Sequence, residues 1–369
     1  MSDEYEDEST EYDDNWKGDV QFKGKHGIFQ IKSTSGDSIP VHFIQTDVQF
    51  DDKVMGKLET FREIFDQESL NLEQILQRDI DDARVSSDMI PYLLSTDYNQ
   101  QIFRSSLTTF YPPIVAILTP IVTGTNDAGE PISTPGSHYS PAYNAHNEGE
   151  KGYHFSVPYG IGENMQAFAK LAQSQEEKYK DNKWAQTELH YVSGSPDESR
   201  MWRLKSPAKI KKTEQSYEVR PEFSKTATME INTDNCKIVI IDGQHRAMSM
   251  LALYRNYNPG MWDGSREPFE IFYKEWNRKV VDKALGYDLS SLTLPITVCV
   301  VPDGMEGSGV DGTEISKVAR EIFLTLNKTA KPVDTIQQQI MDDSNMISEL
   351  MRKQLEMMYN KDEKWTNSR

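Results

Sequence analysis

The first third of the chain has apolar and polar positions in an order that predicts strands followed by helices. In residues 19–50 apolar side chains alternate with polar ones and Gly36 supplies a turn, a pattern typical of short antiparallel strands. Residues 53–66 and 70–95 carry apolar side chains at helical spacing, so both are predicted to be helical. Pro91 marks a break within or after the second of these helices.

The middle of the chain is less regular. The β-branched run within residues 110–118 predicts a buried strand. Residues 119–163 are rich in glycine, proline, asparagine and serine, which indicates a polar loop insertion. A helix at about 164–181 and mixed strands at about 187–232 are expected to follow.

The second half predicts a regular alternation of strand and helix. An apolar strand at 236–241 leads into a helix at 244–257, which stops before an Asn-Pro-Gly terminator. Further elements are expected as strands at 269–273 and 294–301, a glycine-rich loop at 302–312, and helices at 313–328 and 333–359. This alternation favours a mixed α/β core. We therefore expect an α/β domain over residues 17–312 and a helical C-terminal region over 313–369.

The apolar face of the last predicted helix has to be covered. Ile340, Ile347 and Leu350 recur at helical spacing near the end of the sequence. We expect either an earlier element or a further C-terminal segment, missing from this sequence, to cover them.

The net charge narrows the classes of function. The 40 basic and 58 acidic residues give a formal charge of −18, which excludes a uniformly basic coat for nucleic acid. Residues 1–16 contain eight acidic and no basic side chains, so −18 minus −8 leaves −10 for residues 17–369. This predicts a disordered acidic tail at 1–16, with a DNA mimic that shields a basic cleft as the alternative.

Cysteine use and hydropathy bear on the compartment. Only Cys236 and Cys299 are present, which excludes a disulfide scaffold or a cysteine-rich zinc site. The acidic N-terminus lacks the positive region of a secretory leader. The longest apolar stretch, 112–122, is far shorter than the ~20 residues of a membrane span. We expect a cytoplasmic protein that does not contact a membrane.

The stretch VIIDGQHRAMSMLAL at 239–253 combines an apolar strand, a tight turn and a helix start. Gly243 can take a positive φ in the turn, and the unpaired N–H groups of a helix N-terminus bind anions. Arg246 adds a forked cation suited to phosphate, and His245 adds a donor or a proton carrier. Asp242 has alternatives: it can cap the helix, or hold a ribose hydroxyl, Mg²⁺ or an attacking water.

The five residues Asp242-Gly243-Gln244-His245-Arg246 reproduce the signature of the DGQHR-domain family. That family includes relatives of DndB, a regulator of bacterial DNA phosphorothioation, and the DpdB proteins of 7-deazaguanine DNA-modification systems. Softer matches are LQRDIDDARV at 76–85, IPYLL at 90–94, FYPPIVAIL at 110–118 and IFLTLNKTAKPVD at 322–334.

The resemblance implies a ParB/sulfiredoxin-like fold, in which a glycine-containing turn at a helix N-terminus binds nucleotide phosphates. Gly243, His245 and Arg246 match the positions of that turn. If the chain is an enzyme, Asp242, His245 and Arg246 are the candidate catalytic residues, and Gly243 and Gln244 are candidate phosphate ligands. In such a fold residues 76–85 lie near the nucleotide, so Arg78 and Arg84 are further candidates. A solvated, salt-bridged helix face is the alternative for that run.

Two other clusters are candidates for contacts with phosphate or DNA. Asn327, Lys328 and Lys331 lie at a predicted helix end, where they could bind phosphate or simply face the helix dipole. A basic run surrounds Trp202, a combination found in nucleic-acid sites but also on solvated faces. Its members are Arg200, Arg203, Lys205, Lys209, Lys211 and Lys212.

Two main hypotheses result. In the first, the chain binds a nucleoside triphosphate at the turn and hydrolyses it with Mg²⁺, coupled to DNA nicking. In the second, it is a non-catalytic DNA-binding regulator of a DNA-modification cluster. A scaffold subunit for other modification-system proteins is a third, weaker hypothesis. No set of protein ligands predicts a metal site.

Overall fold

The fold of this chain was obtained as a computed structural model. The residues that it describes are 16–32, 38–64, 80–94, 96–97, 102–103, 111–125, 131–135, 152–160, 163–170, 183–193, 201–212, 217–286, 288–301, 318–319, 321–326 and 350.

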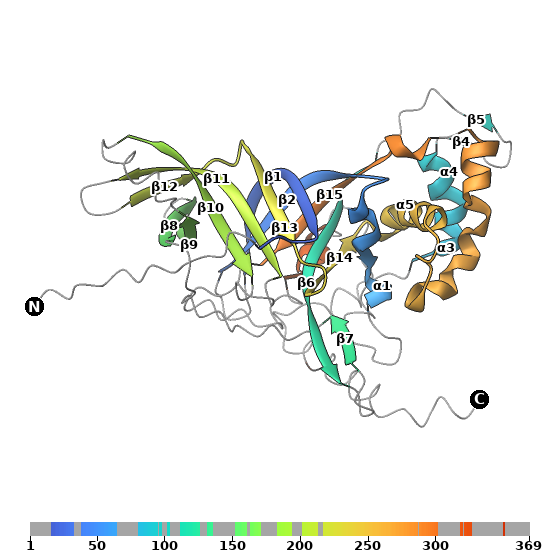
Figure 1. Cartoon of the computed structure of the whole chain (residues 1–369), viewed down its shortest axis with the longest axis horizontal. Coiled ribbons are helices and arrows are strands. Elements are labelled where there is room, and N and C mark those ends of the chain that lie inside the picture. Colours follow the sequence, from blue (N-terminus) through green and yellow to red (C-terminus); the bar gives the residue numbers. More distant parts are fainter. Residues whose placement is uncertain are drawn as a thin grey trace, which may run out of the picture.

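A large mixed sheet runs through the molecule (Figure 1). Its hydrogen-bonded order is β3-β14-β6-β15-β2-β1-β13-β11-β10-β9-β8, with β12 paired to β11 and β7 to β6. The strands are β1 (Val20–Lys32), β2 (Ser38–Gln49), β3 (Leu58–Thr60), β6 (Ile114–Thr125), β7 (Pro131–Pro135), β8 (Gly152–Gly160), β9 (Glu163–Lys170), β10 (Ala185–Ser193), β11 (Trp202–Lys212), β12 (Tyr217–Pro221), β13 (Thr226–Ile231), β14 (Cys236–Asp242) and β15 (Thr293–Val300). A separate two-stranded pair joins β4 (Thr96–Asp97) and β5 (Ile102–Phe103).

Strand direction changes along the sheet. β14 is parallel to β3 and antiparallel to β6, while β15 is parallel to β6 and antiparallel to β2. Five of the seven residues of β14 are buried, which is expected for a strand covered on both faces. This explains why the sequence of β14 is apolar almost throughout instead of alternating.

The helices gather at the end of the sheet formed by β3, β14, β6 and β15 (Figure 1). The longest α-helix among the described residues, α5, follows β14 directly and packs on η1, β3, η2 and η5. The helical elements are η1 (Lys53–Lys57), α1 (Phe61–Ile64), α3 (Asp82–Arg84), η2 (Val85–Met89), α4 (Ile90–Leu93), α5 (Gln244–Tyr257), η5 (Gly264–Trp276), η6 (Lys279–Ala284) and η7 (Leu289–Ser291). The turn from β14 into α5 therefore lies where sheet and helices meet.

Several sequence predictions are confirmed. The coarse prediction of a mixed α/β protein holds, since a large mixed sheet is combined with several helices. The strands expected in 19–50 form the β1–β2 hairpin, and those at 236–241 and 294–301 are β14 and β15. The helix predicted at 244–257 is α5. Helical residues at 318–319 and 321–326 agree with part of the helix predicted at 313–328.

Other predictions are wrong. The polar insertion at 119–163 contains the end of β6 together with β7 and β8, and the helix expected at about 164–181 begins as strand β9. Small polar residues disfavour a core, but they do not prevent backbone pairing along a sheet edge. The segment 53–66 is divided into a 3₁₀ turn, a short strand and one helical turn, because β3 pairs with β14 in the middle of it.

The strand predicted at 269–273 is part of the 3₁₀ helix η5. Tyr273 and Trp276 are buried while Ile271 is exposed. Side chains three residues apart share one face of a 3₁₀ helix, so the aromatic pair faces inward. The short apolar run was compatible with either structure.

The helix expected over 70–95 is described from residue 82 onward. There α3, η2 and α4 follow without interruption, and η2 is a π-helical segment. Pro91 is the second residue of α4 and directly follows the π-helical segment, so the break expected at the proline is a local change of helix type and not an end of the helix. The last predicted helix, 333–359, lies outside the described residues except for Leu350.

No helix in the described part of the chain is long and apolar enough to span a bilayer. The apolar core is continuous from the β1–β2 hairpin through β14 to α5.

Candidate functional site

The turn between β14 and α5 is built around Gly243. This residue has a φ of 78°, in the left-handed region that glycine adopts without steric cost. A Cβ placed there would lie 2.7 Å from Nη2 of Arg246 and 2.9 Å from Cγ2 of Ile114. Glycine is therefore required both for the backbone conformation and for the close approach of these two side chains.

Arg246 folds back beneath the turn. Its Nη2 donates to the carbonyl oxygen of Pro113 at 3.3 Å and lies 3.4 Å from the Asp242 carboxylate. The hydroxyl of Tyr111 donates to the carbonyl oxygen of Arg246 at 3.0 Å. The segment leading into β6 thus contacts the first turn of α5 twice, once through the Arg246 side chain and once through the Arg246 backbone carbonyl.

The N-terminus of α5 begins directly after Gly243, which has no side chain to cap it. The first amides of a helix have no partner within the helix, and the dipole adds positive potential at that end. Asp242 and Arg246 are each partly exposed beside these amides. Gln244, the first helical residue, is buried. The turn can therefore bind an anion mainly through backbone N–H groups, with Arg246 at its side.

His245 connects the turn to a distant segment. The backbone N–H of Asp81 donates to Nε2 of His245 at 3.1 Å. Burial lowers the pKa of His245, and the positive charge of Arg84 lowers it further. The structure therefore brings Arg84 close to the DGQHR residues. The Arg84 side chain is 66% exposed, with the Asp88 carboxylate 4.0 Å away.

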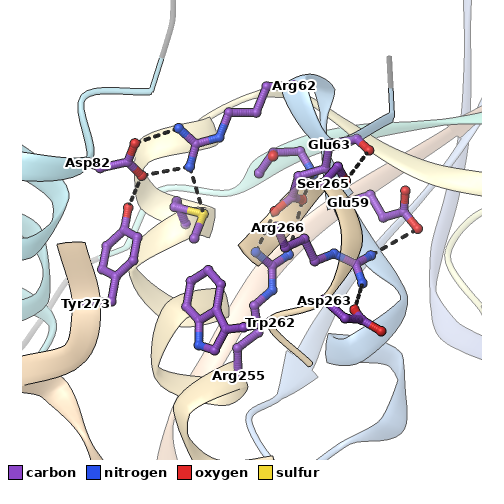
Figure 2. A network of polar contacts seen from close by, with 12 residues as sticks. Glu59, Arg62, Glu63, Asp82, Arg255, Trp262, Asp263, Ser265, Arg266 and Tyr273 are labelled. Atoms are coloured by element: carbon purple, nitrogen blue, oxygen red, sulfur yellow. Dashed lines mark hydrogen bonds and ion pairs between the residues drawn. The ribbon is translucent and has the colours of Figure 1, made fainter. Parts of the chain in front are cut away.

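The segment that carries Arg84 is anchored by a second arginine, Arg62 (Figure 2). Its two terminal nitrogens donate to the Asp82 carboxylate at 2.6 and 2.7 Å. Asp82 also accepts from the hydroxyl of Tyr273, and the Arg62 guanidinium lies 3.6 Å from the centre of the Phe269 ring. This network ties α1, α3 and η5 together next to α5.

A buried ion pair holds α5 to α1 and β3 (Figure 2). Arg255, near the C-terminal end of α5, donates to the Glu63 carboxylate with both terminal nitrogens. Glu63 also accepts from the backbone N–H of Thr60 at 2.7 Å. Burial alone would raise the pKa of Glu63, but Arg255 and the Thr60 N–H outweigh it and lower the pKa. These contacts fix the helix that presents the turn.

The basic run around Trp202 forms most of β11. In a nucleic-acid site an aromatic side chain stacks on the bases, and the position of Trp202 in this strand argues against such stacking. Trp202 and Arg203 are both buried. Arg203 pairs with Glu230 at 2.6 Å, Lys205 lies 3.3 Å from the same carboxylate, and Lys209 pairs with Glu222 at 3.0 Å. Arg203 is buried against its cross-strand partner Glu230, which leaves almost none of its side chain exposed for the predicted contact with DNA.

The remaining predicted residues are placed only in part. Lys211 is half-buried on the same face of β11 as Lys205 and Lys209. Lys212 lies at the end of that strand. Residues outside the described part of the chain are Arg78, Arg200, Asn327, Lys328 and Lys331.

Sequence reasoning missed three residues that shape the site. These residues are Arg62, Asp81 and Tyr111. Asp81 and Tyr111 act through partners far along the chain, His245 and Arg246, and Arg62 acts through Asp82. Helical spacing relates residues three or four apart, so it does not indicate the contact of Asp81 with His245.

Within the described ranges, no three histidine, cysteine, aspartate or glutamate side chains come together in a group that could hold a metal ion. Comparison of the chain with protein-family models, with curated proteins and with solved structures gives no match.

Proposed function

We propose that this chain binds a phosphate group of a nucleotide or of DNA at the turn formed by residues 242–246. One observation carries the proposal: an uncapped helix N-terminus follows Gly243 at positive φ, with Arg246 folded beside it. Backbone amides and the helix dipole favour an anion, and an arginine fork matches phosphate geometry.

The resemblance of Asp242-Gly243-Gln244-His245-Arg246 to the DGQHR signature extends the proposal to a biological setting. It suggests a DndB- or DpdB-like protein of a bacterial or phage DNA-modification or defence system. The adjacency of β14 and β6 next to α5 supports the finer proposal of a ParB/sulfiredoxin-like arrangement around the turn. Other proteins of such a system are proposed partners.

Hydrolysis of a nucleoside triphosphate, coupled to DNA nicking, is a second candidate, favoured by Asp242. Its carboxylate lies partly exposed at the turn, 3.4 Å from Arg246. Mg²⁺ is commonly held by one or two carboxylates together with substrate phosphates, so Asp242 fits as its protein ligand. Bound Mg²⁺ would supply charge neutralisation at the phosphates. Arg246 would hold the phosphate beside it.

The alternative of a non-catalytic DNA-binding regulator needs cations that face DNA. Lys205 and Lys209 face the same side of β11 but lie close to Glu230 and Glu222. These glutamates reduce the positive potential of that strand. The turn and Arg84 are therefore the preferred phosphate contacts in this alternative too.

Two exposed arginines give a matched test. Arg84 lies near His245, whereas Arg278 immediately precedes η6. Each arginine has an aspartate four residues later, Asp88 and Asp282 respectively. Arg84→Gln should weaken binding of fluorescent ATP, GTP or CTP analogues, or of a short DNA duplex, by roughly tenfold, the value of one charge-assisted hydrogen bond. Arg278→Gln should leave it unchanged. Anisotropy titrations in low salt measure both variants.

Equal loss in both variants, or no binding of any of these ligands in low salt, would contradict the proposal. A linear fall of log affinity with log salt would identify DNA phosphates as the contact. Phosphate release that disappears in Asp242→Asn would favour the hydrolytic candidate over the regulator.

A further inference from the structure

His245 makes a contact that constrains its protonation. The backbone N–H of Asp81 can only donate, and it donates to Nε2 of His245 at 3.1 Å. An imidazole nitrogen that accepts a hydrogen bond carries no proton. A neutral ring must then hold its proton on Nδ1, and an imidazolium, with two N–H donors, could not form this contact.

Charged groups around the ring have opposing effects. On the α3 side, Asp81 and Asp82 favour the charged ring and Arg84 opposes it; from α1, Arg62 opposes it as well. The Asp82 carboxylate is occupied by Arg62 and Tyr273, and the Asp81 carboxylate accepts from the backbone N–H of Arg84. With burial as the largest cause, the pKa of His245 is lowered.

We infer that Asp81 is a positioning residue whose backbone N–H fixes His245 as a neutral Nδ1–H donor for an acceptor oxygen of the ligand. His245 then recognises a deprotonated phosphate oxygen through Nδ1 and does not carry protons through Nε2. The tautomer follows from the Asp81 contact alone, and only the identity of the acceptor rests on the proposed function.

A direct test is ¹⁵N NMR of the full-length protein with labelled histidine rings. The free protein should show His245 protonated at Nδ1 and unprotonated at Nε2. A spectrum with Nε2–H, or with both nitrogens protonated at pH 7, would overturn the inference. This measurement needs neither a variant nor a ligand.

Two substitutions at position 81 separate the backbone N–H from the side chain. Asp81→Pro removes the N–H at a φ of −77° that proline tolerates. Asp81→Ala removes the carboxylate, which caps α3 and favours the charged ring, but it keeps the N–H. We expect the Nδ1–H tautomer to persist in Asp81→Ala, and a tautomer mixture with a higher pKa than in Asp81→Ala for Asp81→Pro. An unchanged tautomer in a folded Asp81→Pro would contradict the positioning role.

Sulfate is a suitable probe of the ligand side, because its charge does not change between pH 5 and 8. Followed at the His245 ring signals, the apparent Kd for sulfate should change less than twofold between pH 8 and 6 in the wild type. In Asp81→Pro it should tighten severalfold at pH 6, as the ring gains charge. A wild-type Kd that tightens in the same way would overturn the neutral-donor role. If sulfate does not bind at any pH, the proposed phosphate site is contradicted. The ¹⁵N measurement of the His245 tautomer would still test the role of Asp81 independently.

Discussion

Gly243 shows how much one residue decides at this site. With any side chain there, Arg246 could not lie against the turn and Ile114 could not pack beside it. Glycine at position 243 is thus needed both for the transition from β14 to α5 and for the position of the Arg246 guanidinium. The sequence indicated the positive φ, but the close approach of Arg246 became visible only in the structure.

The first prediction compares two glycines with similar backbone conformation. Gly260 has a φ of 84° and no atom within 4 Å of the point where a Cβ would lie, whereas Gly243 has two close neighbours. Gly260→Ala should cost about 1 kcal/mol of unfolding free energy for the left-handed conformation. Gly243→Ala should cost roughly 1–3 kcal/mol more, because overpacking adds to it.

Urea denaturation of both variants measures the difference. Equal destabilisation would mean that Arg246 and Ile114 move aside without cost. In that case the close approach at Gly243 would not be a requirement of the fold.

At the scale of elements, α5 is the piece that connects sheet, turn and helical layer. Its N-terminal residues contact the segments before α3 and β6, and Arg255 near its other end pairs with Glu63 of α1. The pair is almost fully buried. A buried pair is costly to break, because the remaining partner is left charged and without compensation.

Arg255→Met alone should therefore lower the unfolding free energy by about 3–5 kcal/mol. Adding Glu63→Gln should recover part of this loss, since glutamine is neutral and still accepts from the Thr60 N–H. Arg278→Met breaks an exposed pair with Asp282 and should cost no more than about 0.5 kcal/mol. Urea unfolding of wild type, Arg255→Met, Glu63→Gln and the double variant completes the cycle, with Arg278→Met as the exposed control, and strict additivity would contradict coupling across the pair.

Elements with one strong periodic signal could be predicted from sequence. β14, β15 and α5 combine an apolar pattern with clear end signals, and their positions are confirmed. β7, β8 and β9 lack such a signal, because their glycine, proline and polar residues are typical of loops, and only the pairing of β7 with β6 and of β8 with β9 shows that they are strands. η5 is compatible with two periodicities, and only its buried face against α1, α3 and α5 selects the helix.

For the site, sequence reasoning identified the turn but not its surroundings. Asp242, Gly243, Gln244, His245 and Arg246 are contiguous, so their types and order could be interpreted together. Asp81 and Tyr111 join them through contacts that cross more than a hundred residues, and Arg62 holds the segment of Asp81 in place through Asp82. Burial of Arg203 was equally hidden, since Glu230 lies on another strand.

At the scale of the whole molecule, the sheet encloses a chain of buried polar groups. His26 on β1 contacts the Ser206 hydroxyl at 2.7 Å and His42 on β2 at 2.9 Å. Tyr191 packs against both rings, and the Phe223 ring covers His26. Burial lowers the pKa of His26 to about 4, and burial together with His26 lowers that of His42 well below its usual value.

This arrangement predicts loss of stability in mild acid. Histidines in the unfolded chain take up protons near pH 6.5, whereas His26 in the folded protein does so only near pH 4. The unfolded state therefore binds more protons between these values, and stability falls as the pH falls through that window. His26 alone should account for up to about 3 kcal/mol.

The unfolding free energy of wild type and His26→Gln, measured from pH 7 to pH 4.5, checks this prediction. The variant should show a shallower decline, because carboxylates such as Glu63 contribute equally to both proteins. Parallel curves would mean that His26 is not the group that responds to acid.

The order of strands in the sheet also affects how fast the chain can fold. Val20 of the β1–β2 hairpin pairs with Ile231, and Gln49 at its other edge pairs with Thr293. Both edges of the hairpin therefore stay open until strands more than two hundred residues away arrive. Topologies of such high contact order fold slowly and expose strand edges to other chains meanwhile. During synthesis, the β1–β2 hairpin leaves the ribosome long before β15, so its edges would need protection until β15 has been made.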